Sequence, residues 1–257
     1  MRFVILLCCA AAFFSREALG TIVKLDTPIG SMTFQLYDDA KPVTVANFLS
    51  YITSGRYENS FAHRLPQGFV LQGGGFTYTD ATSAVAIPTF APIASEEGPF
   101  PAYSNVKGTI AMALSGTGND TATSSWFINL KDNDGSGLDN LDTLNGGFTV
   151  FGSVIAGLDV LQAFAGFTNF AGGSGTNVIV DLNGGNPNAP FANVPITKIV
   201  NNTYDTADFI YTTWSVIPEP GMLSLLSLGG FCALGVRRFS RSLRPIPARS
   251  PDGSALR

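Results

Sequence analysis

The segment Phe61–Phe76, FAHRLPQGFVLQGGGF, carries the side chains with the clearest potential for chemistry in this sequence. It holds the only histidine, His63, next to the guanidinium of Arg64, and the amide Gln72 precedes three consecutive glycines. A cation, an amide and apolar residues ahead of a glycine run suggest a groove that binds a peptide. A structural interpretation also fits, in which residues 69–72 form a strand and the glycines a bend where backbones approach closely.

The elements that position this segment begin with two strands and a helix. Residues 22–26 and 31–37 alternate partly between apolar and polar, with Thr27-Pro28-Ile29-Gly30 as the turn between them. Asp38, Asp39 and Pro42 suit the start of a helix. The apolar residues Val45, Phe48, Leu49 and Ile52 follow at helical spacing, and Gly55 ends the helix.

The second half of the chain consists mainly of short apolar runs between polar loops. Strands are predicted at 108–114, 125–130, 148–154 and 194–200, the last of them closing the sheet, and a short helix at 157–164. Residues 77–101, 115–124 and 170–190 are predicted to be loops, and 204–216 a linker. Many short strands with only two helices favour a closed β-barrel.

The segment Phe61–Phe76 resembles the signature FHRxxPGFxxQGGxF of cyclophilin-type peptidyl-prolyl cis–trans isomerases. Further blocks follow in family order, and the resemblance covers residues 21–203. It implies a mainly β fold, a closed eight-stranded antiparallel barrel capped by two α-helices. The supporting blocks are KPVTVANF at 41–48, KGTIAMA at 107–113, WFIN at 126–129, Leu138-Asp139 and FTVFG at 148–152.

The resemblance implies an enzyme that rotates X–Pro bonds in proline-containing peptides and proteins. Amide resonance opposes this rotation with a barrier of ~18–20 kcal/mol, and a donor aimed at the proline nitrogen lowers it because that nitrogen becomes basic in the twisted state. By resemblance Arg64 is that donor, and Gln72 holds the substrate carbonyl. The resemblance assigns the proline pocket and its rim to Phe69, Val70, Phe127, Leu138 and Phe148, with Ala113 along the groove.

Three positions on the far side of this groove differ from the family pattern. Ser125 replaces a glutamine, Gly137 an aromatic residue, and Phe148 a histidine or tyrosine. These changes predict an altered preference for the residue before proline. They also leave open an alternative function, a catalytically weak peptide-binding or extracellular-matrix module that keeps the barrel.

Composition excludes several other classes of protein. The three cysteines, Cys8, Cys9 and Cys232, all lie in the two terminal apolar segments, so the chain between them can hold neither a disulfide framework nor a cysteine–histidine metal cluster. A single histidine also excludes a conventional zinc site. We therefore predict no cofactor and no metal site for the catalytic reaction.

Charge divides the chain into an acidic body and a basic tail. Residues 21–216 contain 7 Lys and Arg against 16 Asp and Glu, whereas residues 217–257 contain 6 basic and 2 acidic residues. An acidic body argues against nucleic-acid binding. The distribution fits an exported domain followed by a positively flanked membrane segment.

Residues 1–20 have the features of a secretory signal peptide. Arg2 precedes an apolar run at 3–14, and Ala18-Leu19-Gly20 provides small residues at a cleavage site. A short membrane anchor is the alternative, although the run is shorter than a comfortable span. We predict cleavage after Gly20.

The C-terminal region predicts a membrane-associated segment. Ile217-Pro218-Glu219-Pro220 is followed by an apolar run at 221–236 and then by Arg237-Arg238, whose long side chains can reach the membrane surface. A buried C-terminal helix is the alternative. The predicted order is a signal peptide at 1–20, the isomerase-like domain at 21–203, a linker at 204–216, a sorting or membrane segment at 217–238 and a basic tail at 239–257.

This C-terminal segment resembles a PEP-CTERM sorting signal, which combines a proline-glutamate-proline motif, an apolar helix and an arginine cluster. The resemblance implies a bacterium with an outer membrane and processing by an exosortase. We therefore predict a protein of the periplasm, cell envelope or extracellular matrix, with membrane contact through residues 221–236.

An acidic stretch at 132–143 partly matches a calcium-binding loop. Asp132, Asp134 and Ser136 supply oxygen ligands at loop positions 1, 3 and 5, and Gly137 is the glycine at position 6. The twelfth residue, however, is Thr143 instead of the glutamate that such loops require. A solvated acidic turn is the other interpretation.

Overall fold

The structure is a computed structural model that describes residues 20–80, 83–97, 103–116, 118–135, 140–183 and 190–218. The predicted signal peptide therefore lies outside the described residues except for Gly20, as do the PEP-CTERM-like segment beyond Pro218 and the basic tail. By its contacts the chain divides into residues 1–217 and 218–257. Within the described ranges no helix is long and apolar enough to cross a membrane.

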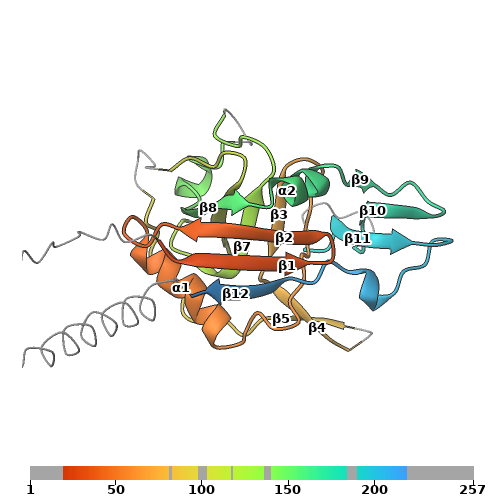
Figure 1. The fold of residues 1–257 in the computed structure, drawn as a ribbon, viewed down its shortest axis with the longest axis horizontal. Coiled ribbons are helices and arrows are strands. Elements are labelled where there is room, and N and C mark those ends of the chain that lie inside the picture. Colours follow the sequence, from red (N-terminus) through yellow and green to blue (C-terminus); the bar gives the residue numbers. More distant parts are fainter. Residues whose placement is uncertain are drawn as a thin grey trace, which may run out of the picture. The chain divides into compact units, whose positions relative to one another are not determined.

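The centre of the domain is a seven-stranded antiparallel sheet with the strand order β12-β1-β2-β8-β6-β7-β3 (Figure 1). Its strands are β1 Ile22–Thr27, β2 Gly30–Leu36, β3 Val70–Gly73, β6 Thr109–Leu114, β7 Ala122–Asn129, β8 Val150–Ala156 and β12 Thr213–Ile217.

This sheet is open, so the prediction of a closed eight-stranded barrel is wrong. Residues 60–64, which lie between its edges β3 and β12, make only isolated bridges, such as Arg64 with Gln72 and Phe61 with Tyr211. The ladder cannot continue past Arg64 because the amide of Leu65 donates to Asn193 O (2.6 Å) and Pro66 has no N–H to donate.

Two α-helices lie where the sequence predicts them, α1 at Pro42–Thr53 and α2 at Leu158–Ala165. The carboxylate that stabilises the start of α1 is, however, a remote one. Glu96 accepts from the amides of Val43 (3.0 Å) and Thr44 (2.7 Å), whereas Asp38 accepts from Thr21. Sequence reasoning placed the acidic cap locally, because a contact across more than 50 residues leaves no local pattern.

Residues 77–101 were predicted to be a surface loop, but β4 (Phe76–Asp80) and β5 (Ser83–Ala86) form a hairpin at the start of this stretch. Residues 87–97, which follow the hairpin, run back along α1. Further on, Ile93 bridges Ala122, and the Lys41 ammonium binds Glu97 Oε1 at 2.8 Å and Glu96 O at 2.9 Å. The side chains of Lys41 and Glu97 are only 3% and 1% exposed, and burial raises the pKa of Glu97.

A second, three-stranded sheet follows α2 and was not predicted. It contains β9 Thr168–Asn169, β10 Gly175–Val180 and β11 Val194–Ile199 in the order β11-β10-β9. The stretch 170–190, expected to be an inserted loop, thus contains β10. The strand predicted at 194–200 pairs with β10 instead of closing the main sheet, because β12 already occupies the position beside β1.

Residues 204–216 do not form the predicted linker. They contain the 3₁₀ turn η3, Thr206–Asp208, and most of β12, which pairs with β1 over its whole length. Trp214 is 7% exposed and packs edge-on against Trp126 and Phe48, with ring centroids 5.2 and 4.9 Å apart. The packing of Trp214 therefore makes β12, which ends at Ile217, part of the folded domain.

The buried pair Lys41–Glu97 generates a test of how the segment 87–97 is attached. Lys41→Met leaves the Glu97 carboxylate buried without its cation, and we expect a loss of about 3–5 kcal/mol in the free energy of unfolding. Lys41→Met combined with Glu97→Leu should recover most of that loss, because no buried charge remains. Urea unfolding of the wild type and the variants measures both effects; additive losses in the double variant would contradict this account.

Candidate active site

Four of the predicted site residues, Val70, Gln72, Ala113 and Phe127, lie on one face of the adjacent strands β3, β7 and β6. Gln72 on β3 is opposite Phe127 on β7, which is opposite Ala111 on β6, which in turn is opposite Val150 on β8. Successive side chains in a strand point to opposite faces. Neighbouring residues such as Trp126 therefore enter the main core, whereas Phe127 belongs to a separate apolar cluster.

This second cluster brings together five of the six residues predicted for the proline pocket and groove. Val70, Ala113 and Phe127 are buried in it, and Phe69 and Phe148 pack against it half-buried. Phe127 and Phe148 meet edge to face, with ring centroids 5.6 Å apart. The sixth residue, Leu138, lies outside the described residues.

Sequence reasoning missed other members of the same cluster. Ala111 was detectable, because it lies two residues from Ala113 in a strand and so shares its face. Leu141 comes from an irregular loop, where no periodicity indicates which side chains turn inward. The cluster also contains Val150, with Tyr37 and Leu144 packed against it.

Arg64 and Gln72 form the polar side of the site. The Gln72 amide donates to Arg64 O at 2.8 Å, and Arg64 Nη1 donates to Gln72 Oε1 at 3.2 Å. The amide oxygen therefore orients the guanidinium, and the Gln72 NH₂ group is left to donate elsewhere. Burial lowers the pKa of Arg64, but a guanidinium starts so high that it stays charged at neutral pH.

Asparagine side chains form a hydrogen-bond network that holds the loops around the apolar cluster. Asn129 on β7 donates to Asn105 Oδ1 (3.2 Å), and Asn133 donates to Asn129 Oδ1 (2.8 Å) and to Phe69 O (3.3 Å). Asn105 in turn donates to Phe148 O (3.1 Å). Because these side chains are buried and mutually bonded, they fix the backbone at Phe69 and at Phe148, both of which pack against the apolar cluster.

The glycine run has the close-approach role that its structural interpretation predicts. A Cβ on Gly73 would lie 2.5 Å from the Trp126 ring, and one on Gly74, which has φ +73°, would lie 2.7 Å from it. A Cβ on Gly75 would lie 3.0 Å from both His63 and Ser125. The glycines thus make room for Trp126 behind the strand that carries Gln72.

His63 is placed as a structural residue. It is 3% exposed, its ring meets Phe76 edge to face at 5.0 Å, and its Nδ1 has no hydrogen-bond partner in the described part of the chain. Burial, with a smaller contribution from the Arg64 charge, lowers the pKa of His63 to about 3. The imidazole is therefore neutral at neutral pH.

Two aspartates of the acidic loop at 132–143 bond to or pair with other residues of the chain. Asp132 Oδ1 accepts from the Lys107 amide at 2.9 Å, and Asp134 bridges Asn140. Residues 136–139, including Gly137, lie outside the described residues. Where the chain is described, no three His, Cys, Asp or Glu side chains gather in a way that could hold a metal ion.

Comparison with known families agrees with this geometry. The family model described as cyclophilin type peptidyl-prolyl cis-trans isomerase/CLD matches residues 22–199. The chain belongs to this family of isomerases, and Arg64, Gln72 and the apolar cluster around Phe127 lie within the matched residues.

Several bacterial relatives are named as peptidyl-prolyl cis-trans isomerases. A peptidyl-prolyl cis-trans isomerase of Acinetobacter baylyi is 33% identical over 194 residues, which cover 75% of this chain and 92% of the relative. The cyp18 isomerase of Streptomyces antibioticus is 40% identical over 56% of this chain and 82% of its own length. Isomerase B of Escherichia coli is 35% identical over 56% of this chain and 84% of its own.

Among solved structures, a cyclophilin-type isomerase of Cryptosporidium parvum aligns with 78% of this chain and 99% of its own, at 21% identity and a TM-score of 0.47.

The burial of a neutral His63 generates a pH prediction. In the unfolded chain histidine binds a proton near pH 6.5, but in the folded protein only near pH 3, so the unfolded state binds more protons between these values. Stability should therefore fall as pH decreases from about 6.5 toward 3, with a slope of up to ~1.4 kcal/mol per pH unit from this residue.

His63→Gln, which cannot titrate, should have a flatter stability profile over this range. Unfolding by urea at several pH values, with the difference between wild type and variant taken at each pH, isolates the contribution of His63 from those of the carboxylates. Parallel profiles for the two proteins would show that His63 is protonated equally in both states.

Proposed function

We propose that this protein accelerates the cis–trans isomerisation of X–Pro bonds in exported or envelope proteins, and so assists their folding. The observation that carries the proposal is the bond between Arg64 and Gln72 at the edge of the apolar cluster around Phe127. Together they offer a fixed cation and an amide donor beside a surface that suits a proline ring.

The reaction needs positioning and one well-placed donor. We propose that the proline ring packs on Phe127, Phe148 and Val70, while Arg64 donates to the proline nitrogen. In the planar amide this nitrogen is a poor acceptor, whereas in the twisted state its lone pair is localised. The hydrogen bond is therefore stronger in the transition state than in the ground state, and each ~1.4 kcal/mol of that difference gives about a tenfold rate increase.

Gln72 has two roles in this mechanism. Its Oε1 holds the guanidinium, so that Arg64 loses little side-chain freedom on binding substrate. Its NH₂ group then donates to a substrate carbonyl and fixes the peptide next to the pocket. Gln72 lies directly opposite Phe127 in the β3–β7 ladder. The substrate carbonyl bound by Gln72 and the proline ring packed on Phe127 are therefore held in a fixed relative position.

The preference for the residue before proline is expected to differ from that of other family members. Ser125 lies on the same face of β7 as Phe127 and is short, and the Gly75 position lies close to its hydroxyl. The side chain at 125 therefore reaches less far along the groove than a glutamine would. The same shortening favours the second candidate function, a peptide-binding module of low activity.

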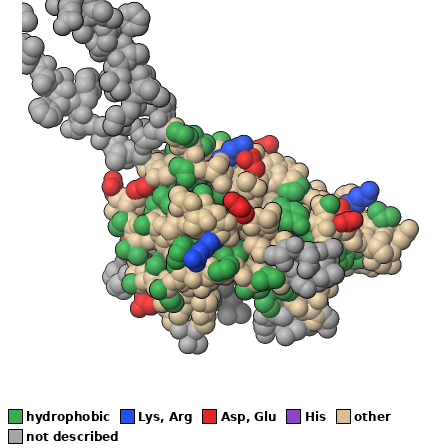
Figure 2. Space-filling view, turned by 90° about the horizontal axis from the view of Figure 1, so that it is seen from below, with side chains coloured by type: hydrophobic (Ala, Val, Ile, Leu, Met, Phe, Trp, Pro, Cys, Tyr) green, Lys and Arg blue, Asp and Glu red, His purple; other side chains and the backbone are tan. Residues whose placement is uncertain are grey.

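The clients are proposed to be proteins outside the cytoplasm. The sequence of residues 1–20 supports export, and that of residues 217–238 supports sorting by an exosortase with membrane contact through residues 221–236. On the face of the domain shown in Figure 2, lysine and arginine side chains are scattered and form no patch that could follow a nucleic-acid backbone.

Replacement of Arg64 tests the catalytic proposal. In a protease-coupled assay with a proline peptide, wild type should accelerate isomerisation, and Arg64→Ala should lose about 2–4 kcal/mol of transition-state stabilisation, or 30- to 1,000-fold in kcat/KM. Arg64→Lys should recover little, because an ammonium lacks the planar fork that lets a guanidinium hold Gln72 with one N–H group while another points at the substrate in a fixed direction.

Arg56→Ala is the matched control, because this arginine bonds to Pro88 O and stacks on Phe90 away from the pocket. It should retain wild-type rates. Binding of the peptide without acceleration, equal for wild type and Arg64→Ala, would exclude catalysis and support the peptide-binding module.

Export is tested on the protein recovered from a bacterium with an outer membrane. The mature chain should be in the cell envelope fraction and begin at Thr21, because the small-residue cleavage site ends at Gly20. N-terminal sequencing measures this directly. A chain that still begins at Met1 in the cytoplasmic fraction would refute the export proposal.

A further inference from the structure

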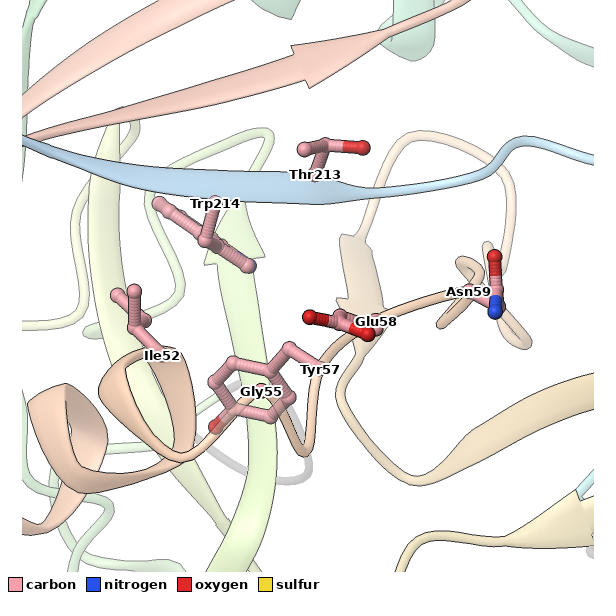
Figure 3. A pocket seen from close by; sticks show the side chains of 7 residues that line it. All are labelled: Ile52, Gly55, Tyr57, Glu58, Asn59, Thr213 and Trp214. Atoms are coloured by element: carbon pink, nitrogen blue, oxygen red, sulfur yellow. The ribbon is translucent and has the colours of Figure 1, made fainter.

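A pocket of about 400 Å³ lies beside β12, away from the proposed active site (Figure 3). Its walls come from the C-terminal end of α1, the segment 55–59 that follows, and Thr213 and Trp214 of β12. Trp214 packs against Trp126, whose side chain is on the face of β7 opposite to Phe127. The pocket and the Arg64 site are therefore on different sides of the sheet.

Trp214, which lines the pocket, carries a buried donor without an acceptor among the described residues. Trp214 is 7% exposed, and its Nε1 has no hydrogen-bond partner among the described residues. Figure 3 shows the indole reaching into the space between α1 and β12, on the side where the Glu58 carboxylate lies. An unsatisfied buried N–H is costly, so a bound group that brings an acceptor is favoured.

The pocket also attracts positive charge. Glu58 is exposed at its mouth, and within the described ranges the structure shows no cation bound to it. The nearest arginine in sequence, Arg56, is engaged by Pro88 O at 2.8 Å and by the Phe90 ring at 3.6 Å. The last turn of α1 has no basic residue, so the partial negative charge of the helix C-terminus adds to that of Glu58.

The remaining walls suit an aliphatic chain. Ile52 is half-buried, and Tyr57 is buried with its hydroxyl donating to Ser124 O at 2.6 Å, so it presents its ring to the pocket. An apolar wall that leads to a carboxylate matches a lysine or arginine side chain, which has an apolar stem and a charged end.

The edge of β12 provides a place for the backbone of such a residue. In the main sheet β12 pairs only with β1. Thr212 N donates to Ser60 O on the opposite side, and since backbone groups alternate in an antiparallel strand, those of Trp214 also face that side. No hydrogen bond to them is found from any described residue. An extended segment can therefore lie along this edge.

We propose that this pocket binds a lysine or arginine side chain presented by an extended segment of a partner protein. The stem packs on Ile52 and Tyr57, the cation pairs with Glu58, and a backbone carbonyl accepts from Trp214 Nε1. Because that nitrogen is covered in this conformation, the carbonyl reaches it after a local rearrangement of the pocket wall. The proposal is independent of isomerase activity.

The test uses the full-length ¹⁵N-labelled protein and the peptide acetyl-Thr-Lys-Thr-amide, which has no proline. The indole Nε1–H resonance of Trp214, assigned with Trp126→Phe, should shift to saturation. Replacing lysine by norleucine, or using Glu58→Gln, should weaken binding about two- to fivefold, the range for a partly exposed ion pair. Arg64→Ala should bind as wild type does, which separates this site from the catalytic one.

Three results would overturn the proposal. The Trp214 resonance does not move, or lysine and norleucine peptides bind equally, or Glu58→Gln binds the lysine peptide as wild type does. A fourth comparison uses free lysinamide, which supplies the cation without flanking residues. Binding as strong as that of the peptide would refute the extended segment and leave a site for small cations.

Discussion

The active-site face of this protein depends on one close contact, that between Trp126 and the backbone at Gly73 and Gly74. Because neither glycine carries a Cβ, β3 can lie against the indole and pair with β7 in a register that places Gln72 opposite Phe127. Any larger residue at 73 would push β3 away from Trp126. The polar and apolar halves of the site would then lose their relative position.

The two faces of β7 connect the catalytic site to the core. Phe127 belongs to the apolar cluster proposed to bind proline, while Trp126 is packed against Trp214 from β12. The last strand therefore supports the site, although it is remote from it in sequence. The same Trp214 also forms a wall of the pocket beside β12.

Buried polar groups were the part of the structure least accessible to sequence reasoning. The Lys41–Glu97 pair, the cap of α1 by Glu96 and the asparagine network around Asn129 all join segments that are far apart in the chain. Single polar residues in loops carry no periodicity, so their partners cannot be identified before the chain is folded. Their energetic value arises only from the low-dielectric surroundings that folding creates.

The family, both α-helices and most strands of the main sheet could be predicted from the sequence, as could the residues of one apolar cluster, Phe69, Val70, Ala113, Phe127 and Phe148. These follow from spacing and from contiguous motifs, which are local properties. The catalytic roles of Arg64 and Gln72 stay predictions. The tertiary structure alone decided that the sheet stays open, that β12 belongs to the domain, and that β9–β11 form a separate sheet. Strand pairing and edge closure depend on which backbone groups find partners across long separations, and no local pattern specifies that choice.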